Sequence, residues 1–401
     1  MEKKFTNYAA NENNPKWQKM ISRCEELYKR PNESRTEFGR DYSRILFSNS
    51  YRRLKSKTQV FFSPKDDHIC TRIEHVNNVE CVSYNIANSL GLNTELTRAI
   101  SIAHDLGHSP FGHKGEKILS NILQEELNEK FWHEKNGLYL VDNIELLENT
   151  KGKKKNLNLT YAVRDGIISH CGEIDENVLK PREEFIDLKD YTKPNEYAPF
   201  SWEGCVVKVA DKISYLGRDI EDAISLGIIE EQELDELRPL FNHSIDKINN
   251  TVIISALIGD LVKNSSVENG LVFSEQAFNI INTIKKFNYK HIYQNKRLAP
   301  SDRYFEYVIT EIYQFFLNIF DKENTLNNLE KYRRNYPKTI EKFIQWIEKY
   351  SNLPHRNKLG LDNKIIYDIS NKQDYIRAVI TYISGMTDNY AIETYNSIIS
   401  F

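Results

Sequence analysis

The chain has 401 residues, of which 40% are hydrophobic and 28% are charged, and its formal net charge at pH 7 is -3. This composition is typical of a soluble globular protein, and it excludes a general electrostatic attraction to nucleic acid or to an anionic membrane. The 5 cysteines form no CxxC pair, and neither a signal-peptide core nor a run of about 18 apolar residues occurs, so we expect a cytoplasmic protein without disulfides, zinc fingers or membrane segments.

Apolar residues recur at helical spacing along most of the chain, which predicts an all-α fold. In the first clear helix they occupy positions 73, 76, 79, 82, 86 and 90, and Gly91 can end that helix. This helix carries His75. Asn93 can cap the next helix, which runs to the pair His104–Asp105 before Pro110 breaks the pattern. We therefore expect the His–Asp pair at a helix end.

Two further helices are expected downstream. One starts near Gly112. The other spans about 202–225 and places Asp211, Tyr215 and Asp219 four residues apart, on one face of an otherwise apolar helix. This face can present polar groups to a ligand, although a solvated acidic face is the alternative.

Four residues carry the strongest chemical signal: His75, His104, Asp105 and Asp211. Two imidazoles and two carboxylates suit one divalent metal ion, and such a set leaves room for water and phosphate oxygens on the ion. The ion can bind a phosphoryl oxygen, neutralise charge and orient an attacking water. Mg or Mn is favoured, Fe, Co, Ni and Zn stay open, and a structural metal is the alternative interpretation.

Charged neighbours of these residues suit an anionic substrate. Arg72 lies three residues before His75 on the same predicted helix face, and Lys212 follows Asp211 directly. Both cations are candidate phosphate contacts.

Histidines crowd the same region of the chain. His113 and Glu116 lie three residues apart at a predicted helix start, so the carboxylate can orient the imidazole as a proton-transfer pair. His108 and His133 are further candidates for the catalytic pocket, either as participants or as supporting hydrogen-bond partners.

The order and spacing of these motifs resemble the deoxynucleoside triphosphate triphosphohydrolases of the HD-domain superfamily, including the bacterial dGTPase-like enzymes. The resemblance is carried by the segments Gly39–Val60, Arg72–His75, His104–Glu116, Ala210–Asp219 and Tyr382–Ala391. It extends from about Arg35 to Tyr395 and is looser between about 230 and 372.

The resemblance implies an HD-domain helical core with additional C-terminal helices and one divalent metal per site. It implies His75, His104, Asp105 and Asp211 as metal ligands, His113, Glu116, His108 and His133 as catalytic residues, and Gln59, Arg53, Arg72, Lys212, Tyr215 and Asp219 as substrate contacts. Gln59 is expected near the 3′-hydroxyl of a deoxyribose, and Tyr215 where a 2′-hydroxyl would clash.

The implied reaction is hydrolysis of a dNTP, either dGTP or several dNTPs, to a deoxynucleoside and inorganic triphosphate. The resemblance also implies a homo-oligomer and an effector site for a nucleotide or single-stranded DNA. Residues 1–230 are expected to form the catalytic core with an N-terminal substrate-binding segment, and 231–401 a helical extension packed on it.

Two alternatives stay open. Another HD phosphohydrolase, such as a nucleotidase or a phosphodiesterase, uses the same metal ligands. A noncatalytic nucleotide sensor or nucleic-acid-binding module predicts ligand binding without turnover, and the basic, aromatic tract Lys285–Arg297 suits nucleic acid, triphosphate or a neighbouring subunit. An exposed amphipathic helix and turn explains that tract equally well.

Overall fold

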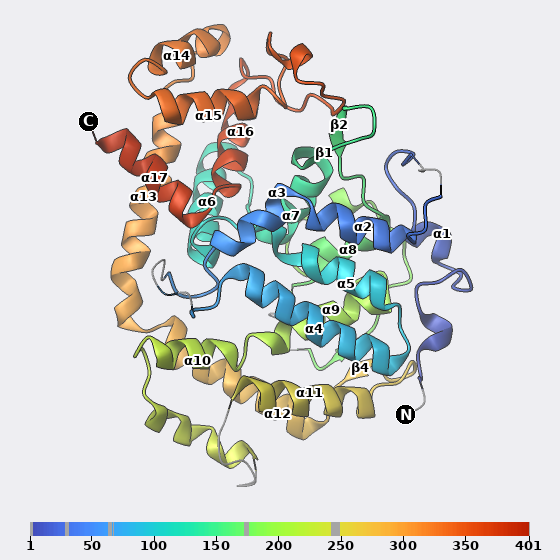
Figure 1. Ribbon diagram of the computed structural model, residues 1–401. Coiled ribbons are helices and arrows are strands. Elements are labelled where there is room, and N and C mark those ends of the chain that lie inside the picture. Colours follow the sequence, from blue (N-terminus) through green and yellow to red (C-terminus); the bar gives the residue numbers. More distant parts are fainter. Residues whose placement is uncertain are drawn as a thin grey trace. The chain divides into compact units, whose positions relative to one another are not determined.

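The computed structural model describes residues 3–28, 32–62, 66, 68–171, 176–241 and 249–400. Helices dominate these residues, and the strands found among them form two antiparallel two-stranded ribbons (Figure 1). The predicted all-α fold class is confirmed. The chain forms two compact units, each assembled from three separate segments.

The first unit comprises Met1–Leu46, Lys65–Asp105 and Leu159–Pro300. Its α-helices and strands are α1 (Trp17–Met20), α2 (Glu37–Leu46), α4 (Arg72–Leu90), α5 (Thr94–Ala103), α8 (Tyr161–Ser169), β3 (Val178–Leu179), α9 (Trp202–Ser214), α10 (Arg218–Ser225), α11 (Asn250–Asn264), β4 (Leu271–Val272) and α12 (Glu275–Phe287). Strands β3 and β4 pair through Val178 with Val272 and Leu179 with Leu271.

Local signals explain α4 and α5. The Glu74 carboxylate accepts a hydrogen bond of 2.7 Å from the Thr71 backbone N–H, which caps the start of α4. Gly91 ends α4 in the left-handed conformation with φ of 84°. The Asn93 side chain accepts from the Leu96 N–H and caps α5. The predicted bounds of these two helices and the position of His104 at a helix end are confirmed.

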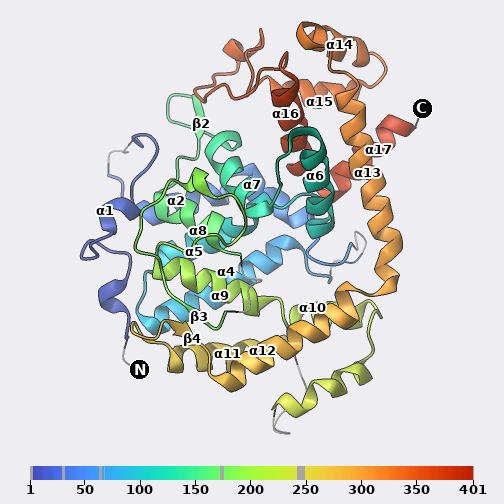
Figure 2. The ribbon, with the colours of Figure 1, turned by 180° about the vertical axis from the view of Figure 1, so that it is seen from behind.

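Helix α5 is the centre of the first unit. It contacts α2, α4, α8 and α9, and Figure 2 shows it from behind among these helices. Its apolar side chains are fully buried, and seven of its ten residues are buried. Because α5 packs against other helices on most of its sides, its place in the unit is fixed. The position of the residue that follows its last turn is fixed with it.

The prediction of one helix over 202–225 is wrong. Helix α9 ends at Ser214, and α10 begins at Arg218. A side chain at Gly217 would approach the Asn250 Cα of α11 to 2.7 Å, so α11 packs directly against the backbone at the break. Tyr215 caps the end of α9 and Asp219 belongs to α10, so the two do not share a helix face with Asp211.

The second unit comprises Phe47–Pro64, Leu106–Asn158 and Ser301–Phe401. It contains α3 (Asn49–Arg53), α6 (Gly112–Leu127), α7 (His133–Tyr139), a π-helical turn (Leu140–Ile144), β1 (Leu146–Glu148), β2 (Lys154–Asn156), α14 (Thr325–Tyr332), α15 (Pro337–Ile347), α16 (Lys372–Ser384), α17 (Asp388–Ile399) and all but the first two residues of α13 (Ala299–Leu317). The predicted helix start near Gly112 is confirmed. Strands β1 and β2 pair in antiparallel register, with Leu146 opposite Asn156 and Glu148 opposite Lys154.

Aromatic and aliphatic side chains of α6, α13, α15 and α16 fill the core of the second unit. Fully buried examples are Leu119, Ile309, Phe316, Phe343 and Tyr375. The division into a catalytic core over 1–230 and a helical extension over 231–401 that packs on this core stays a prediction.

The basic, aromatic tract 285–297 lies in the first unit, where it ends α12 and forms the π-helical turn Asn288–Tyr293. His291 Nδ1 lies 2.9 Å from Glu233 Oε1, and the Arg297 guanidinium donates to the Leu226 carbonyl at 2.6 Å. Some of its polar groups therefore have partners within their own unit, and nucleic-acid binding by this tract stays a prediction. None of the described helices is both long and apolar enough to cross a membrane.

Two glycines of the first unit should respond oppositely to alanine. A Cβ on Gly166 in α8 would lie 2.5 Å from the fully buried Ile100 side chain, whereas a Cβ on the exposed Gly259 in α11 would meet nothing within 4 Å. We expect Gly166→Ala to destabilise the protein by about 1–3 kcal/mol through overpacking. Gly259→Ala should stabilise it by roughly 0.5–1 kcal/mol. Urea denaturation measures both changes, and shifts of the same sign would contradict the packing described for α5 and α8.

Candidate functional site

The four predicted metal ligands come together in the first unit. His75 lies in the first turn of α4, His104 and Asp105 follow the last turn of α5, and Asp211 lies near the end of α9. His75 Nε2 is 3.1 Å from Asp211 Oδ1 and 3.8 Å from Asp105 Oδ2. His104 Nε2 is 3.7 Å from Asp211 Oδ1 and 3.4 Å from Asp105 Oδ1. The donor atoms carried by α4, by α9 and by the turn after α5 therefore converge on one place.

The orientation of His104 fits a metal ligand. Its Nδ1 lies 2.6 Å from the Ser101 carbonyl, so Nδ1 carries the proton and Nε2 keeps its lone pair. Nε2 is buried and has no hydrogen-bond partner among the described residues. A buried polar atom without a partner is costly, and a metal ion held by His75, His104 and Asp211 would satisfy it.

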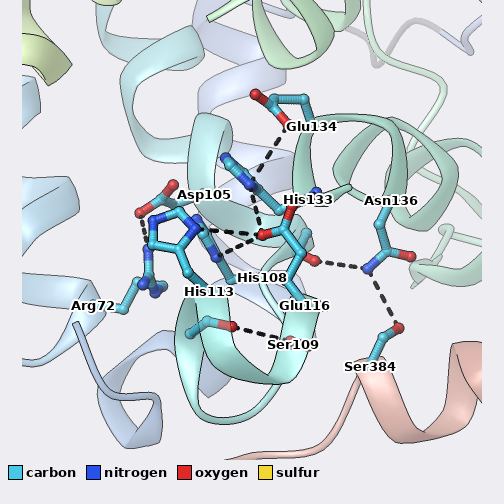
Figure 3. Close-up of polar contacts among 12 residues, drawn as sticks. Arg72, Asp105, His108, Ser109, His113, Glu116, His133, Glu134, Asn136 and Ser384 are labelled. Atoms are coloured by element: carbon cyan, nitrogen blue, oxygen red, sulfur yellow. Dashed lines mark hydrogen bonds and ion pairs between the residues drawn. The ribbon is translucent and has the colours of Figure 1, made fainter. Parts of the chain in front are cut away.

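Opposite charges stabilise each other in this cluster. Burial alone would raise the pKa of Asp211, but the His75 and His104 imidazoles outweigh burial and lower it. Burial would lower the pKa of His75, but Asp211 and Asp105 outweigh burial and raise it. Asp105 also accepts a 2.7 Å ion pair from the buried Arg72 guanidinium. Figure 3 includes this pair. The predicted contact of Arg72 with phosphate stays a prediction.

Other predicted substrate contacts of the first unit are also buried or lie at helix ends. The Lys212 ammonium lies 5.5 Å from the centre of the Phe278 ring. Asp219 is buried in the first turn of α10, where it accepts a 2.5 Å hydrogen bond from the Tyr293 hydroxyl. Burial raises the pKa of Asp219 to about 7. The sequence analysis missed Tyr293, although the tract that contains it was noticed for its charge.

The histidine cluster lies in the second unit and is built around Glu116 on α6 (Figure 3). Glu116 Oε2 lies 3.0 Å from His133 Nδ1, 3.6 Å from His113 Nδ1 and 3.9 Å from His108 Nδ1. Burial would raise the pKa of Glu116, but these imidazoles outweigh burial and lower it well below its usual range. Glu116 is therefore an ionised carboxylate among three imidazoles.

His133 contacts Glu116 more closely than the predicted partner His113 does. Glu116 Oε1 also accepts from the His133 backbone N–H at 3.1 Å, and the His108 ring stacks on His133 at 3.8 Å. The His113 side chain is 61% exposed, so it is the imidazole that solvent and ligands can reach. His133 thus holds the carboxylate that faces His113, and a catalytic or supporting role of His108 stays a prediction.

The turn before α6 depends on the C-terminal helix of the same unit. Phe111 has φ of 64°, an unusual value for a residue with a side chain. Its N–H donates to Asp388 Oδ1 at 2.9 Å, and its ring stacks on Phe305 at 4.2 Å. Asp388 Oδ2 accepts from the Thr58 N–H at 2.8 Å, next to Gln59. The sequence analysis missed Asp388, which lies inside the C-terminal motif.

Arg53 has partners within the second unit. Its guanidinium lies 2.9 Å from Glu145 Oε1 and 2.7 Å from Ser50 Oγ. The roles of Arg53 and Gln59 as substrate contacts stay predictions.

Known proteins are similar to this chain over most of its length. The HD domain family matches residues 72–216, which include all four predicted metal ligands, and the phosphohydrolase-associated domain matches residues 338–397. A deoxyguanosinetriphosphate triphosphohydrolase-like protein of Rickettsia bellii is 31% identical over 380 residues, covering 92% of this chain and 93% of the relative. Proteins with the same description are 30% identical in Caldanaerobacter subterraneus, over 91% of this chain and 85% of the relative, and 32% identical in Desulfatibacillum aliphaticivorans, over 72% and 75%.

Removal of one carboxylate should remove the metal. We expect Asp211→Asn to weaken Mn²⁺ binding by roughly 100-fold or more, since loss of a mere supporting partner already costs about 10–100-fold. Asp235→Asn is the matched control, because the Asp235 side chain is 65% exposed and pairs only at the surface with Arg238. Calorimetric titration of the metal-stripped proteins measures both affinities. Equal affinity in the two variants would show that Asp211 is no ligand.

Asp219 should make stability depend on pH. Its folded pKa of about 7 exceeds the ordinary aspartate pKa of 3.8, so the folded state keeps a proton that the unfolded state loses, and stability falls as pH rises from about 4 to about 7. Between pH 5 and 8 this contributes on the order of 2–3 kcal/mol. Asp219→Asn removes the titration, so the variant should gain stability over the wild type as pH rises. Urea denaturation at both pH values, in a chelator, measures the gain, and a constant difference would refute the assignment.

Proposed function

Because this chain belongs to the HD-domain phosphohydrolase family that includes the deoxyguanosinetriphosphate triphosphohydrolase-like proteins, we propose that it hydrolyses deoxynucleoside triphosphates to deoxynucleosides and inorganic triphosphate. The observation that carries this proposal is the convergence of His75, His104, Asp105 and Asp211 around the unpartnered His104 Nε2. This donor set suits a divalent ion that meets phosphate oxygens.

One divalent ion, Mg²⁺ or Mn²⁺, would be held by the two histidines and two aspartates. When bound, it supplies charge neutralisation at a phosphate oxygen and orientation of water. The carboxylates would hold it together with the imidazoles, and the Arg72 guanidinium keeps the Asp105 carboxylate in place through the 2.7 Å ion pair.

We assign the substrate contacts by the same likeness. Arg72 and Lys212 would contact phosphate oxygens, because a guanidinium and an ammonium complement the charge of a triphosphate. Tyr215, Asp219 and Gln59 would contact the deoxyribose. A protonated Asp219 carboxyl, favoured by its raised pKa, can both donate to and accept from a sugar hydroxyl.

We assign the proton transfer to His113. Glu116 stays ionised and lies 3.6 Å from His113 Nδ1, so it can orient the ring while Nε2 exchanges a proton. Water attacks the α-phosphorus, the new P–O bond forms as the bond to the 5′-oxygen breaks, and that oxygen leaves with a proton. His108 and His133 keep Glu116 in position.

We also propose that the protein acts in the cytoplasm as a homo-oligomer, as the family resemblance implies.

His113→Ala should separate chemistry from metal binding. We expect the variant to bind Mn²⁺ as the wild type does and to lose about 100-fold or more in kcat, the usual contribution of general acid–base catalysis. His355→Ala is the matched control, since that imidazole is 68% exposed and its Nδ1 lies 3.4 Å from Glu348 Oε1, outside the proposed site. Steady-state kinetics with each dNTP measures the effect. Near wild-type kcat in His113→Ala would sink the acid–base assignment.

Product analysis tests the reaction itself. The wild type should convert dNTPs, under Mg²⁺ or Mn²⁺, to deoxynucleoside and intact triphosphate, with rNTPs turned over more slowly. Orthophosphate as the product would identify a nucleotidase instead, and nucleotide binding without turnover under any divalent metal would identify a sensor.

A further inference from the structure

A cavity of about 340 Å³ lies within the second unit, apart from the residues assigned above to the metal and to proton transfer. Its walls come from α3, the π-helical turn Leu140–Ile144, the β1–β2 ribbon, the end of α15 and the end of α16. Cavities of roughly 300–1,000 Å³ hold small molecules in proteins. This one is large enough for one ring system and a charged group.

Three cations line this cavity: Arg53, Lys154 and Lys349. Among the described residues, no hydrogen bond or ion pair of the Lys154 or Lys349 ammonium is found. Arg53 Nε is buried and also lacks a hydrogen-bond partner there. Donors that line a cavity without acceptors of their own can receive the oxygens of an anion.

Glu145, the carboxylate in this wall, does not neutralise all three cations. Its oxygens already accept from the Ser50 hydroxyl at 2.5 Å, from the Asn49 N–H at 2.9 Å and from the Arg53 guanidinium at 2.9 Å. Three positive side chains and one negative one leave a net charge of +2 on the lining. Burial, followed by the nearby Lys154, lowers the pKa of Lys349, as expected for like charges held close together.

Hydrogen bonds hold the backbone of both lysines in place. Lys154 belongs to β2, and its N–H and carbonyl also pair with the Gly360 carbonyl at 3.0 Å and the Asp362 N–H at 2.9 Å. The Lys349 carbonyl accepts from the Asn363 amide at 3.0 Å and from Arg356. The backbone of each lysine is therefore hydrogen-bonded to the same chain segment, residues 360–363.

Three residues of the lining are aromatic: Trp346, Tyr350 and Tyr382. The Trp346 ring centre lies 5.0 Å from that of Tyr350 and 5.3 Å from that of Tyr382. The Tyr350 hydroxyl is used within the wall, where it donates to the Ile144 carbonyl at 2.7 Å. These rings offer an apolar surface beside the cations, and such a surface favours a ligand with an apolar or aromatic body.

We propose that this cavity binds a small phosphate monoester, with its phosphate between Arg53, Lys154 and Lys349 and its organic body against Trp346 and Tyr350. A phosphate dianion matches the net charge of the lining, and its oxygens supply the acceptors that the two ammonium groups and Arg53 Nε lack. Apart from Arg53, which the family resemblance also implies as a substrate contact, the lining contains no residue assigned to the proposed hydrolysis.

The test is a calorimetric titration of the full-length protein in EDTA, so that no metal-dependent binding or hydrolysis contributes. The probes are phenyl phosphate, inorganic phosphate and benzyl alcohol. Phenyl phosphate should bind more tightly than inorganic phosphate, and benzyl alcohol should not bind measurably. No binding of phenyl phosphate, or equal binding of inorganic phosphate, would overturn the proposal.

Lysine variants locate the binding. Lys349→Gln should weaken phenyl phosphate binding about tenfold, the loss expected for one charge-assisted hydrogen bond. Lys154→Gln changes an exposed residue of β2 and should weaken phenyl phosphate binding by the same factor. It tests the site even if Lys349→Gln misfolds. Lys338→Gln, an exposed lysine at the start of α15 outside the lining, is the matched control and should not change affinity. Unchanged affinity in both lining variants would refute the site.

Two further probes distinguish the sources of the phosphate. A nucleoside 5′-monophosphate that competes with phenyl phosphate identifies a nucleotide ligand, and a sugar phosphate that competes equally identifies a broader metabolite site. Because dNTP hydrolysis is assayed separately and with metal, failure of either proposal leaves the other standing.

Discussion

The first unit depends on two carboxylates, Asp105 and Asp211, that lie close together beside a guanidinium and two imidazoles. Burying a charge is unfavourable unless an opposite charge is close, and here each carboxylate has its own cation or imidazole. Arg72 matches Asp105, and the two imidazoles match Asp211. The site thus exists because α5, buried on most sides, ends where α4 and α9 meet it. The same packing that stabilises the unit places the donor atoms.

The second unit follows the same rule with different partners. Glu116 is surrounded by three imidazoles, and Glu145 by a guanidinium, a hydroxyl and a backbone N–H. An imidazole can gain or lose a proton near neutral pH, whereas a guanidinium cannot, so the first arrangement suits proton transfer and the second suits fixed charge. The choice of partner therefore distinguishes a carboxylate suited to proton transfer from one suited to a fixed charge in a single unit.

Structural features that depend on residues close together in the chain were predictable from the sequence. Features that depend on contacts between distant segments were not. Capping residues and apolar spacing gave α4, α5 and the start of α6, because Glu74, Gly91 and Asn93 act within one helical turn. The break between α9 and α10 was missed, since it depends on α11 packing at Gly217, far along the chain. The pairing of Tyr293 with Asp219 was missed for the same reason. Residue types suggested the metal donors, but only the fold brings them within contact distance.

Asp388 joins three segments of the second unit that are widely separated in the chain. Its carboxylate accepts from the N–H groups of Thr58 and Phe111, which leave the ribosome hundreds of residues before it does. Those two segments cannot complete their hydrogen bonding during most of translation, and the strained backbone of Phe111 must wait for its acceptor. We therefore expect the second unit to mature only after synthesis is nearly complete, and chaperones that shield nascent chains to matter most for this part of the protein.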